Sequence, residues 1–410
     1  MTLASDFARV TTNGQRATGI GARKMRVDAE RQLPLSGVLV AEFCNVAAGP
    51  YCGMLLADMG ATVIKIEPPE GDMLRHWPPH TEGFSENFAS LNRGKKSIAL
   101  DLKNATDRDT AWRIMCRADV VVENNRPGAM ERLGLGWTKI HAANAKLIYC
   151  SISAYGQSGP RALQGGFDVT IQAASGIMSV TGEPGGAPVK CGVPLTDFSA
   201  GLYGAFAICA ALAQVRAGGS GTHIDVAMLG TSLAIGALQT SEFFGTGRDP
   251  KPLGSAHPRN APYQAYRARD RFFVIAAGND KLWASVCQIV GRSDLAADSR
   301  FSTVRDRARN QSELAAILTE IFRTRDAVQW LEEFERAGVP ASLINSYSEA
   351  VADPQVEASG WIQPMTLPSG ARTRTFASPL RFDGSLVPVR TRPPLLDENR
   401  YEIMELINGA

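Results

Sequence analysis

The sequence predicts an α/β protein whose larger domain is a Rossmann-like, doubly wound parallel sheet, joined to a smaller α+β domain. A short apolar strand at residues 37–43, a helical stretch at 50–59 and a second strand at 62–67 follow one another. Such strand-helix-strand units form parallel sheets. The pattern then repeats as helix, strand, helix and strand over residues 107–118, 119–123, 137–144 and 147–151.

The second half of the chain is organised differently. Two mostly apolar stretches rich in Ala and Gly, residues 197–217 and 225–244, are expected to be helices, and a Gly- and Pro-rich loop follows at 245–262. A strand at 272–277 and helices at 281–290 and 312–322 indicate the smaller domain. We therefore predict a flexible extension over residues 1–33, a large domain over 34–225 and 335–410, and a small domain over 226–334.

Composition limits the possible partners. Lys and Arg number 43 against 41 Asp and Glu in 410 residues, so the net charge of +2 gives no global basic field for nucleic acid. The longest apolar stretch, residues 202–213, is shorter than the roughly 20 residues that cross a bilayer, so no membrane is expected. Seven cysteines without a C-x-x-C pair indicate a reducing compartment, and we expect a cytoplasmic protein. The Arg-rich start leaves an organellar transit peptide as an alternative.

The usual nucleotide and metal motifs do not fit. The segment after the first strand, residues 45–53, has two glycines at the wrong spacing for G-x-G-x-x-G, and no Walker A sequence occurs. His76 and His80 form the only close histidine pair, and no cysteine lies near them. We therefore expect no metal site and no permanently bound cofactor.

Two features carry candidate chemistry. Arg93, Lys95, Lys96 and Lys103 form a basic group, which is either a solvated strand and loop or a binding site for phosphates. Asp168 follows Gly165-Gly166 and precedes a helix rich in small residues. That position suits an N-cap, and it equally suits a nucleophilic carboxylate whose glycine neighbours let a ligand approach.

Several segments together carry a family resemblance. They read AAGPYCGMLLADMGATVIKIEPPEGD, LNRGKKSIALDLK, VENNRPGAMERLGLG, GFDVTIQAASG and PLTDFSAGLYG, in this order. The chain resembles the family III CoA-transferases, which include formyl-CoA:oxalate and L-carnitine CoA-transferases, from about Leu35 through Leu396. The resemblance implies an interlocked homodimer, acyl-CoA and carboxylic acid substrates, and a large domain that binds CoA.

The resemblance also implies roles for single residues. Asp168 would attack the acyl-CoA thioester and form first an aspartyl anhydride and then an aspartyl-CoA thioester. Asn45 and Ala47 stand where the oxalate enzyme has His and Gln beside the acyl group, so oxalate is not the expected acceptor. The expected CoA contacts are Val46, Ala48, Arg93, Leu100, Lys103, Asn124 and Arg132.

The loop and strand at residues 253–280, LGSAHPRNAPYQAYRARDRFFVIAAGND, resemble the branch that uses succinyl-CoA with C5 dicarboxylates such as glutarate, itaconate and citramalate. His257 and Arg259 are either contacts for the distal carboxylate of the acceptor or parts of a structural loop. Two alternatives stay open, an α-methylacyl-CoA racemase-like enzyme and a non-catalytic CoA-ester-binding protein. The racemases pair the aspartate with an upstream histidine, and between His80 and Asp168 only His141 is available.

Overall fold

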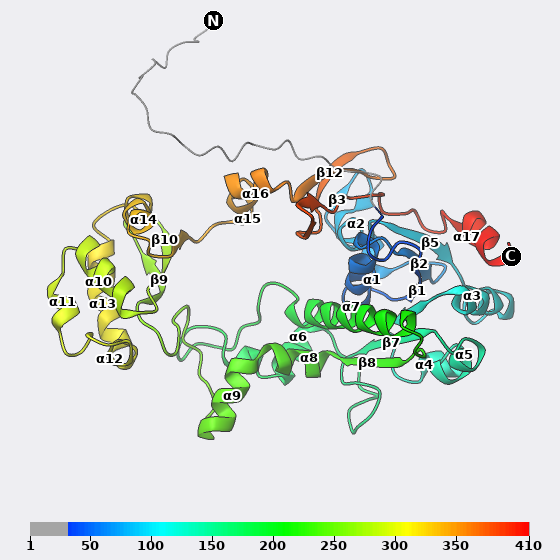
Figure 1. Cartoon of the computed structure of the whole chain (residues 1–410), viewed down its shortest axis with the longest axis horizontal. Helices are drawn as coiled ribbons and strands as arrows, with labels where there is room; N and C mark the ends of the chain where they lie inside the picture. Colours follow the sequence, from blue (N-terminus) through cyan, green and yellow to red (C-terminus); the bar gives the residue numbers. More distant parts are fainter. Residues whose placement is uncertain (1–31, 410) are drawn as a thin grey trace, which may run out of the picture.

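The computed structural model of the protein describes residues 32–409. Residues 1–31 of the predicted extension lie outside the described residues. Figure 1 shows a large lobe built around one sheet and a smaller lobe, with a connecting region between them.

A parallel sheet forms the centre of the large lobe. Within the described residues it has six strands in the order β5-β2-β1-β6-β7-β8, which is the order of the doubly wound Rossmann fold. The strand order reverses between β1 and β6, where Phe43 and Glu123 are register partners at the strand ends. The strands are β1 (Leu39–Phe43), β2 (Thr62–Glu67), β5 (Lys95–Ala99), β6 (Val120–Glu123), β7 (Ile148–Ser153) and β8 (His223–Ala227).

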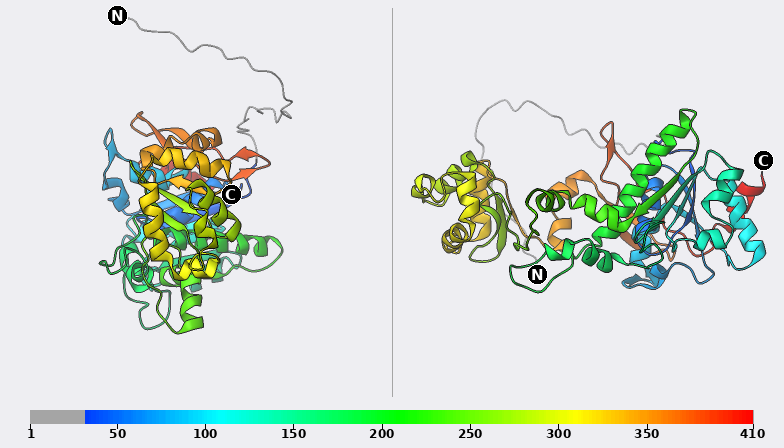
Figure 2. Two further views of the ribbon diagram at one scale, coloured as in Figure 1. Left: turned by 90° about the vertical axis from the view of Figure 1, so that its left-hand side faces the viewer. Right: turned by 90° about the horizontal axis from the view of Figure 1, so that it is seen from below.

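Helices cover both faces of this sheet (Figure 2). On one face, Val40, Val63 and Val120 pack in a core shared with helices α1 (Ala48–Asp58) and α7 (Leu195–Arg216). On the other face, Ala41 and Ile64 belong to a second core. Its helices are α3 (Ala105–Arg117), α4 (Ala129–Arg132), α5 (Trp137–Ala143) and α17 (Arg400–Asn408). Because successive residues of a strand point to opposite faces, the continuous apolar runs in the sequence are explained by burial on both sides.

Two glycines let α1 pack closely between the sheet and α7. A Cβ at Gly53 would lie 1.7 Å from Oε2 of Glu42 on β1, and one at Gly201 would lie 2.7 Å from the carbonyl oxygen of Ala48. The glycines of the AAGPYCG and AGLYG segments therefore serve helix packing at these positions.

One predicted element is wrong. Residues 225–244 were expected to form one helix, but His223–Ala227 form strand β8, which pairs with β7. The chain then continues directly into α8 (Met228–Ile235) and α9 (Ala237–Thr246). A short strand that runs without a turn into an apolar helix shares the helix's composition, so the pattern did not separate the two.

The smaller lobe has its own core, formed by residues between Ala261 and Val339. Its antiparallel sheet runs in the order β11-β10-β9, with helices packed against it. Val226 and Met228 belong to the core of the large lobe. The domain boundaries at 226 and 334 stay a prediction. The elements are β9 (Tyr263–Arg267), β10 (Phe272–Ala276), α10 (Asp280–Ile289), α11 (Asp294–Ala297), α12 (Val304–Arg309), α13 (Gln311–Phe322), α14 (Ala327–Arg336) and β11 (Ala341–Leu343).

The remaining elements connect these parts. Between β2 and β5 lie η1 (Met73–His76), β3 (His80–Thr81), β4 (Phe84–Ser85) and α2 (Glu86–Asn92), and after β7 come α6 (Asp168–Ala174) and η2 (Ile177–Ser179). The chain returns from the smaller lobe through α15 (Tyr347–Val351), α16 (Pro354–Ser359), β12 (Ile362–Thr366), β13 (Arg372–Phe376), β14 (Arg381–Phe382) and β15 (Ser385–Leu386).

Helix α7 is long and apolar enough, by length and composition, to cross a membrane. In the fold it packs along α1, α8 and strands β7 and β8. One side of α7 is therefore buried in the core of the large lobe, while Leu202 and Phe206 on the same helix are exposed. The prediction that no membrane takes part remains a prediction.

Candidate functional site

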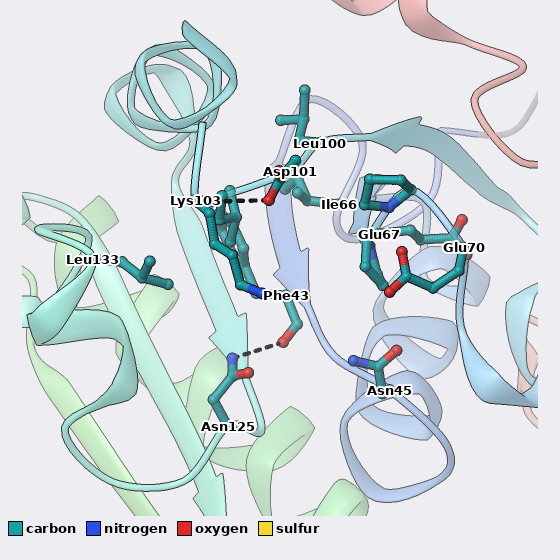
Figure 3. A pocket seen from close by; sticks show the side chains of 13 residues that line it. Phe43, Asn45, Ile66, Glu67, Glu70, Leu100, Asp101, Lys103, Asn125 and Leu133 are labelled. Carbon is teal, nitrogen blue, oxygen red and sulfur yellow. Dashed lines mark hydrogen bonds between the residues drawn. The ribbon is translucent and has the colours of Figure 1, made fainter. Parts of the chain in front are cut away.

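A cavity of about 410 Å³ lies at the carboxyl ends of the strands on the β5 side of the sheet. We call it the β5-side cavity, and Figure 3 shows Lys103 and Asn125 on one side of it and Glu67 and Glu70 on the other. Ligands of open α/β sheets bind at this edge. The lining residues are Phe43, Asn45, Ile66, Glu67, Pro68, Pro69, Glu70, Leu100, Asp101, Leu102, Lys103, Asn125 and Leu133.

A second cavity of about 440 Å³ reaches from the β1–α1 loop to the start of α6, and we call it the α6-side cavity. Asn45 and Asn125 line both cavities, so the two spaces adjoin at the point where the strand order reverses. Among the residues that line the second cavity are Asn45–Ala48, Asn124–Pro127, Gln164–Phe167, Thr170, Asp197 and Met228.

The β1–α1 loop is held tightly between the cavities. The backbone N–H of Asn45 donates to Oδ1 of Asn124 at 2.9 Å, and Nδ2 of Asn124 donates to the carbonyl oxygen of Asn45 at 2.8 Å. Val46 has a φ of 65°, a left-handed conformation that is unfavourable for a β-branched residue. Its N–H donates to Oδ1 of Asp72 at 3.2 Å. A strained residue at a cavity wall is typical of a binding loop.

A fully buried ionic network lies behind this loop. Nζ of Lys65 is 2.8 Å from Oδ2 of Asp72 and 3.2 Å from Oε1 of Glu42, and it donates to the carbonyl oxygen of Cys44 at 2.7 Å. Nζ of Lys95 is 2.8 Å from Oε2 of Glu42. Burial lowers the pKa of Lys65, but the carboxylates of Glu42 and Asp72 outweigh it and raise that pKa overall. The network therefore holds Asp72 in place as a hydrogen-bond acceptor for the loop.

Asp168 is the first residue of α6, and the N-cap position belongs to Phe167. The side chain of Asp168 caps no N–H of its own helix. Instead Oδ1 accepts hydrogen bonds from the N–H and the Oγ1 hydroxyl of Thr196, at 3.0 and 2.9 Å. Oδ2 accepts from Nε2 of Gln172 at 2.7 Å. The carboxylate is therefore oriented by groups of α6 and α7 beside the α6-side cavity, which its neighbours Phe167 and Thr170 line.

Two other carboxyl groups near the cavities have unusual proton affinities. Burial, and then the charge of Asp168, raise the pKa of Asp197 to about 7. Burial raises the pKa of Glu123 to about 7 as well, although hydrogen bonds with Ser151 and Asn125 act in the opposite direction. Carboxyl groups with raised pKa values are common in active sites.

Most of the predicted CoA contacts lie together. Val46 and Ala48 line the α6-side cavity together with Asn45, Ala47 and Asn124. Leu100 and Lys103 line the β5-side cavity. Arg132 is exposed on α4 and lines neither cavity, although the next residue, Leu133, lines the β5-side cavity.

Three predicted residues lie elsewhere. Arg93 was expected to meet phosphates, but its side chain is buried and Nη2 lies 2.7 Å from Oδ2 of Asp58. Arg93 lines neither of the two cavities. In the loop at 253–260, Arg259 forms a 3.1 Å ion pair with Glu242 on α9, and the ring of His257 lies against Tyr263. Neither residue lines the two cavities.

Four residues of the site, Asn125, Gln172, Thr196 and Asp197, were not among those predicted from the sequence. Thr196 and Asp197 stand in the PLTDFSAGLYG segment, and their position before a long helix was the available signal. The link to Asp168 spans 28 residues for Thr196, so no local pattern indicates it. Within residues 32–409, no group of three or more His, Cys, Asp or Glu side chains is placed to hold a metal ion.

The chain is similar to known proteins over most of its length. Residues 35–400 match the description of CoA-transferase family III. The chain is 39% identical to a succinate–glutarate CoA-transferase of Agrobacterium fabrum, over 91% of this chain and 96% of that protein. It is 38% identical to an acetyl-CoA:oxalate CoA-transferase of Acetobacter aceti, over 89% of this chain and 93% of that protein.

The chain belongs to CoA-transferase family III. A crystal structure of a CAIB/BAIF family protein from Brucella suis superposes with a TM-score of 0.82 at 38% identity, covering 92% of this chain and all of that one. The resemblance found in the sequence motifs is thus confirmed, and so is the α/β fold with a doubly wound sheet. The protein is an enzyme of the CoA-transferase type.

The racemase alternative gains no support from this family III site. The residues that line the α6-side cavity, all within the described part of the chain, include no histidine. His141 lies on α5, where its ring stacks on Trp137 at a centroid distance of 4.2 Å. The histidine that the racemases pair with the aspartate is therefore absent from the residues that line this cavity.

Proposed function

We propose that this enzyme transfers CoA from succinyl-CoA, or a similar acyl-CoA, to a dicarboxylic acid through covalent intermediates on Asp168. One observation carries the proposal. A carboxylate held by three hydrogen bonds lies beside a cavity that adjoins a second cavity at the strand ends. An elongated thioester fits such a pair of spaces, with its reacting end at the carboxylate and its nucleotide end at the sheet.

The chemistry follows from the nucleophile. A carboxylate oxygen of Asp168 attacks the thioester carbonyl, and the bond to sulfur breaks, which leaves a mixed anhydride and CoA thiolate. The thiolate then attacks the aspartyl carbonyl, which releases the donor acid and forms an aspartyl-CoA thioester. The acceptor acid repeats these steps in reverse, and Asp168 returns as a carboxylate. Splitting one exchange into such steps conserves the thioester energy.

We assign the nucleotide end of CoA to the β5-side cavity. Lys103 supplies a cation for phosphate, and Leu100 and Ile66 supply apolar surface for a base. Asn45 and Asn125, at the junction of the cavities, would contact the chain between the nucleotide and the sulfur. We also propose that Arg132, which is exposed beside Leu133, contacts a phosphate at the rim of this cavity. Arg93 is not part of this proposal, because Asp58 already pairs with it.

For the acceptor we propose a class of compounds, the dicarboxylic acids, rather than one acid. Relatives named for glutarate and for oxalate match this chain at similar identity, so both acids belong among the candidates. Arg259 and His257 are proposed to meet the distal carboxylate of the acceptor. For this, Arg259 would exchange the carboxylate of Glu242 for that of the substrate, with the loop at 253–260 brought to a cavity by this chain or by a second copy.

We also propose a homodimer in the cytoplasm. Large apolar side chains around α6 to α9 are exposed, among them Phe167 at 70%, Phe206 at 73% and Phe244 at 80%. Exposed apolar groups of this size favour contact with another protein surface. All seven cysteines are free thiols, which supports a reducing compartment. Light scattering coupled to size-exclusion chromatography is expected to give twice the mass of one chain.

Isotope exchange tests the proposed activity. Labelled succinate incubated with succinyl-CoA and the full-length enzyme should enter the thioester, and a panel of glutarate, itaconate, mesaconate, citramalate, malate and oxalate should identify the acceptor. A protein that only binds CoA esters gives no exchange. Exchange of an α-proton with solvent, without activation of any acid, would favour the racemase-like function instead.

A further inference from the structure

A second carboxyl group lies beside Asp168 at the proposed reaction site. Asp197 stands in the first turn of α7, directly after Thr196, which donates two hydrogen bonds to Asp168. Asp197 lines the α6-side cavity together with the β1–α1 loop and Phe167. Asp197 therefore lines the cavity directly, and Asp168 lies next to it at the start of α6, near enough for its charge to act on Asp197.

The surroundings of Asp197 contain little that would stabilise a negative charge. Among residues 32–409 its carboxyl forms no hydrogen bond and no ion pair, whereas Asp168 accepts three hydrogen bonds. The charged group that acts on it is Asp168 from α6, and Arg126 from the loop after β6 lines the same cavity. Helices α1 and α8, which pack against the start of α7, present no charged side chain there. The pKa of Asp197, raised to about 7 first by burial and then by Asp168, agrees with this arrangement.

Each step of the proposed reaction passes through negative charge at this place. The attacking carboxylate, the tetrahedral oxyanions, the CoA thiolate and the incoming acid are all anionic, and a second ionised carboxylate would repel them. A neutral carboxylic acid attracts them instead, because its O–H donates a hydrogen bond to the developing negative charge.

We propose that Asp197 acts as a protonated carboxylic acid whose O–H donates a hydrogen bond to the anions formed beside Asp168 during CoA transfer. This inference rests on the proposed function. The proton stays on Asp197 throughout, so the bonds that form and break are only those between carbonyl carbon, carboxylate oxygen and sulfur. Asp197 is in this sense a catalytic residue that is not a nucleophile.

The pH profile of the full-length enzyme, together with those of two variants, tests this proposal. Wild-type turnover should fall about tenfold per pH unit above about pH 7. Asp197→Asn, a neutral donor at every pH, should lose this fall and keep turnover within about tenfold of wild type at pH 6. Asp197→Leu, which has no donor, should lose about a hundredfold at all pH values. Asp109→Asn, an exposed residue paired with Arg113, is the matched control and should behave as wild type.

The comparison of variants is needed because Glu123 also has a pKa of about 7. An Asp197→Asn profile with the wild-type fall, or an Asp197→Leu enzyme with full turnover, would overturn the proposal. An Asp197→Asn enzyme that is folded and binds CoA but is inactive would overturn it too, because the ionised form would then be required. A wild-type enzyme without any label exchange would overturn the proposed function and this inference together.

Infrared spectroscopy gives a readout that needs no turnover. The carbonyl band of a protonated carboxylic acid should titrate near pH 7 in the wild type. In Asp197→Asn the band should lose the intensity of one group and keep that of Glu123. A difference spectrum without such a band would show that Asp197 is ionised, which overturns the proposal while leaving the proposed function intact.

Discussion

Two groups of acidic side chains lie on either side of the β1–α1 loop, and they differ in what balances their charge. Behind the loop, Glu42 and Asp72 are fully buried and paired with Lys65 and Lys95. Beside the cavity, Asp168 is held by neutral donors only, and Asp197 has no partner among the described residues. A carboxylate without a cation keeps its reactivity toward a carbonyl, and a paired one serves as a fixed support.

The largest effect is expected from Asp168. Replacing Asp168 by Asn leaves an oxygen for Thr196 but removes the nucleophile, so turnover should fall at least about ten-thousandfold, as for other covalent catalysts. The measurement is succinate exchange, with CoA binding as a check on folding. Asp294→Asn, at the first position of α11, is the matched control and should keep full activity. An active Asp168→Asn enzyme would show that Asp168 is not the nucleophile. The carboxyl groups beside the cavity would then not differ in role from the paired ones behind the loop.

The buried ionic network around Lys65 should contribute strongly to the free energy of unfolding. Lys65→Met leaves Glu42 and Asp72 with less compensation in a buried site, and the free energy of unfolding should fall by about 3–5 kcal/mol. Chemical denaturation measures this. Lys96→Met on strand β5 removes a partly exposed ion pair with Glu402, and a change below about 1 kcal/mol is expected there. Equal losses for both lysines would contradict the assignment of Lys65 to a buried support.

Within the described part of the chain, Glu123 is a buried carboxyl group without a cation beside it, and its titration should make stability depend on pH. Its pKa in the folded protein, about 7, lies above the usual value near 4.5, so the folded state binds the proton more tightly. The resulting stability is fully present below about pH 4.5 and is lost as the pH rises through about 7, by a total of roughly 3 kcal/mol. Glu123→Gln should remove that part of the pH dependence between pH 4.5 and 7 in denaturation curves. An unchanged pH dependence would show that Glu123 is ionised in the folded protein.

The smallest effect concerns the nucleotide end. Lys103 is exposed at the rim of the β5-side cavity, so Lys103→Met should weaken CoA binding by about tenfold at low salt, and the difference should shrink as salt is added. Isothermal titration with CoA is the measurement. Lys146→Met, exposed at the opposite end of the sheet before β7, should bind CoA as wild type does. A loss at Lys146 alone would place the nucleotide elsewhere.

Local patterns predicted much of the fold. The strands at 62–67 and 119–123 and the helices around 50–59 and 107–118 coincide with β2, β6, α1 and α3 within a few residues. Each of these elements buries defined faces, and the spacing of its apolar residues in the sequence reflects that burial. Strand β8 was missed because its composition continues into α8 without a turn signal.

The site residues that directly follow the ends of strands were predictable from the sequence. Asn45, Leu100 and Asn124 belong to segments whose place at the carboxyl edge of a parallel sheet is set by topology. Arg93 was misplaced because a sequence does not tell a buried arginine paired with Asp58 from an exposed one. The link from Asp168 to Thr196 and Asp197 depends on the packing of α6 against α7, which no spacing in the sequence indicates.

Trapping of the covalent intermediate tests the central claim most directly. Succinyl-CoA is added to the enzyme, the reaction is quenched with borohydride or hydroxylamine, and the peptides are analysed by mass spectrometry. We expect the modification on the peptide that contains Asp168, absent in Asp168→Asn and present in Asp197→Asn. Modification of a different residue, or transfer of CoA without any modified peptide, would contradict Asp168 as the nucleophile.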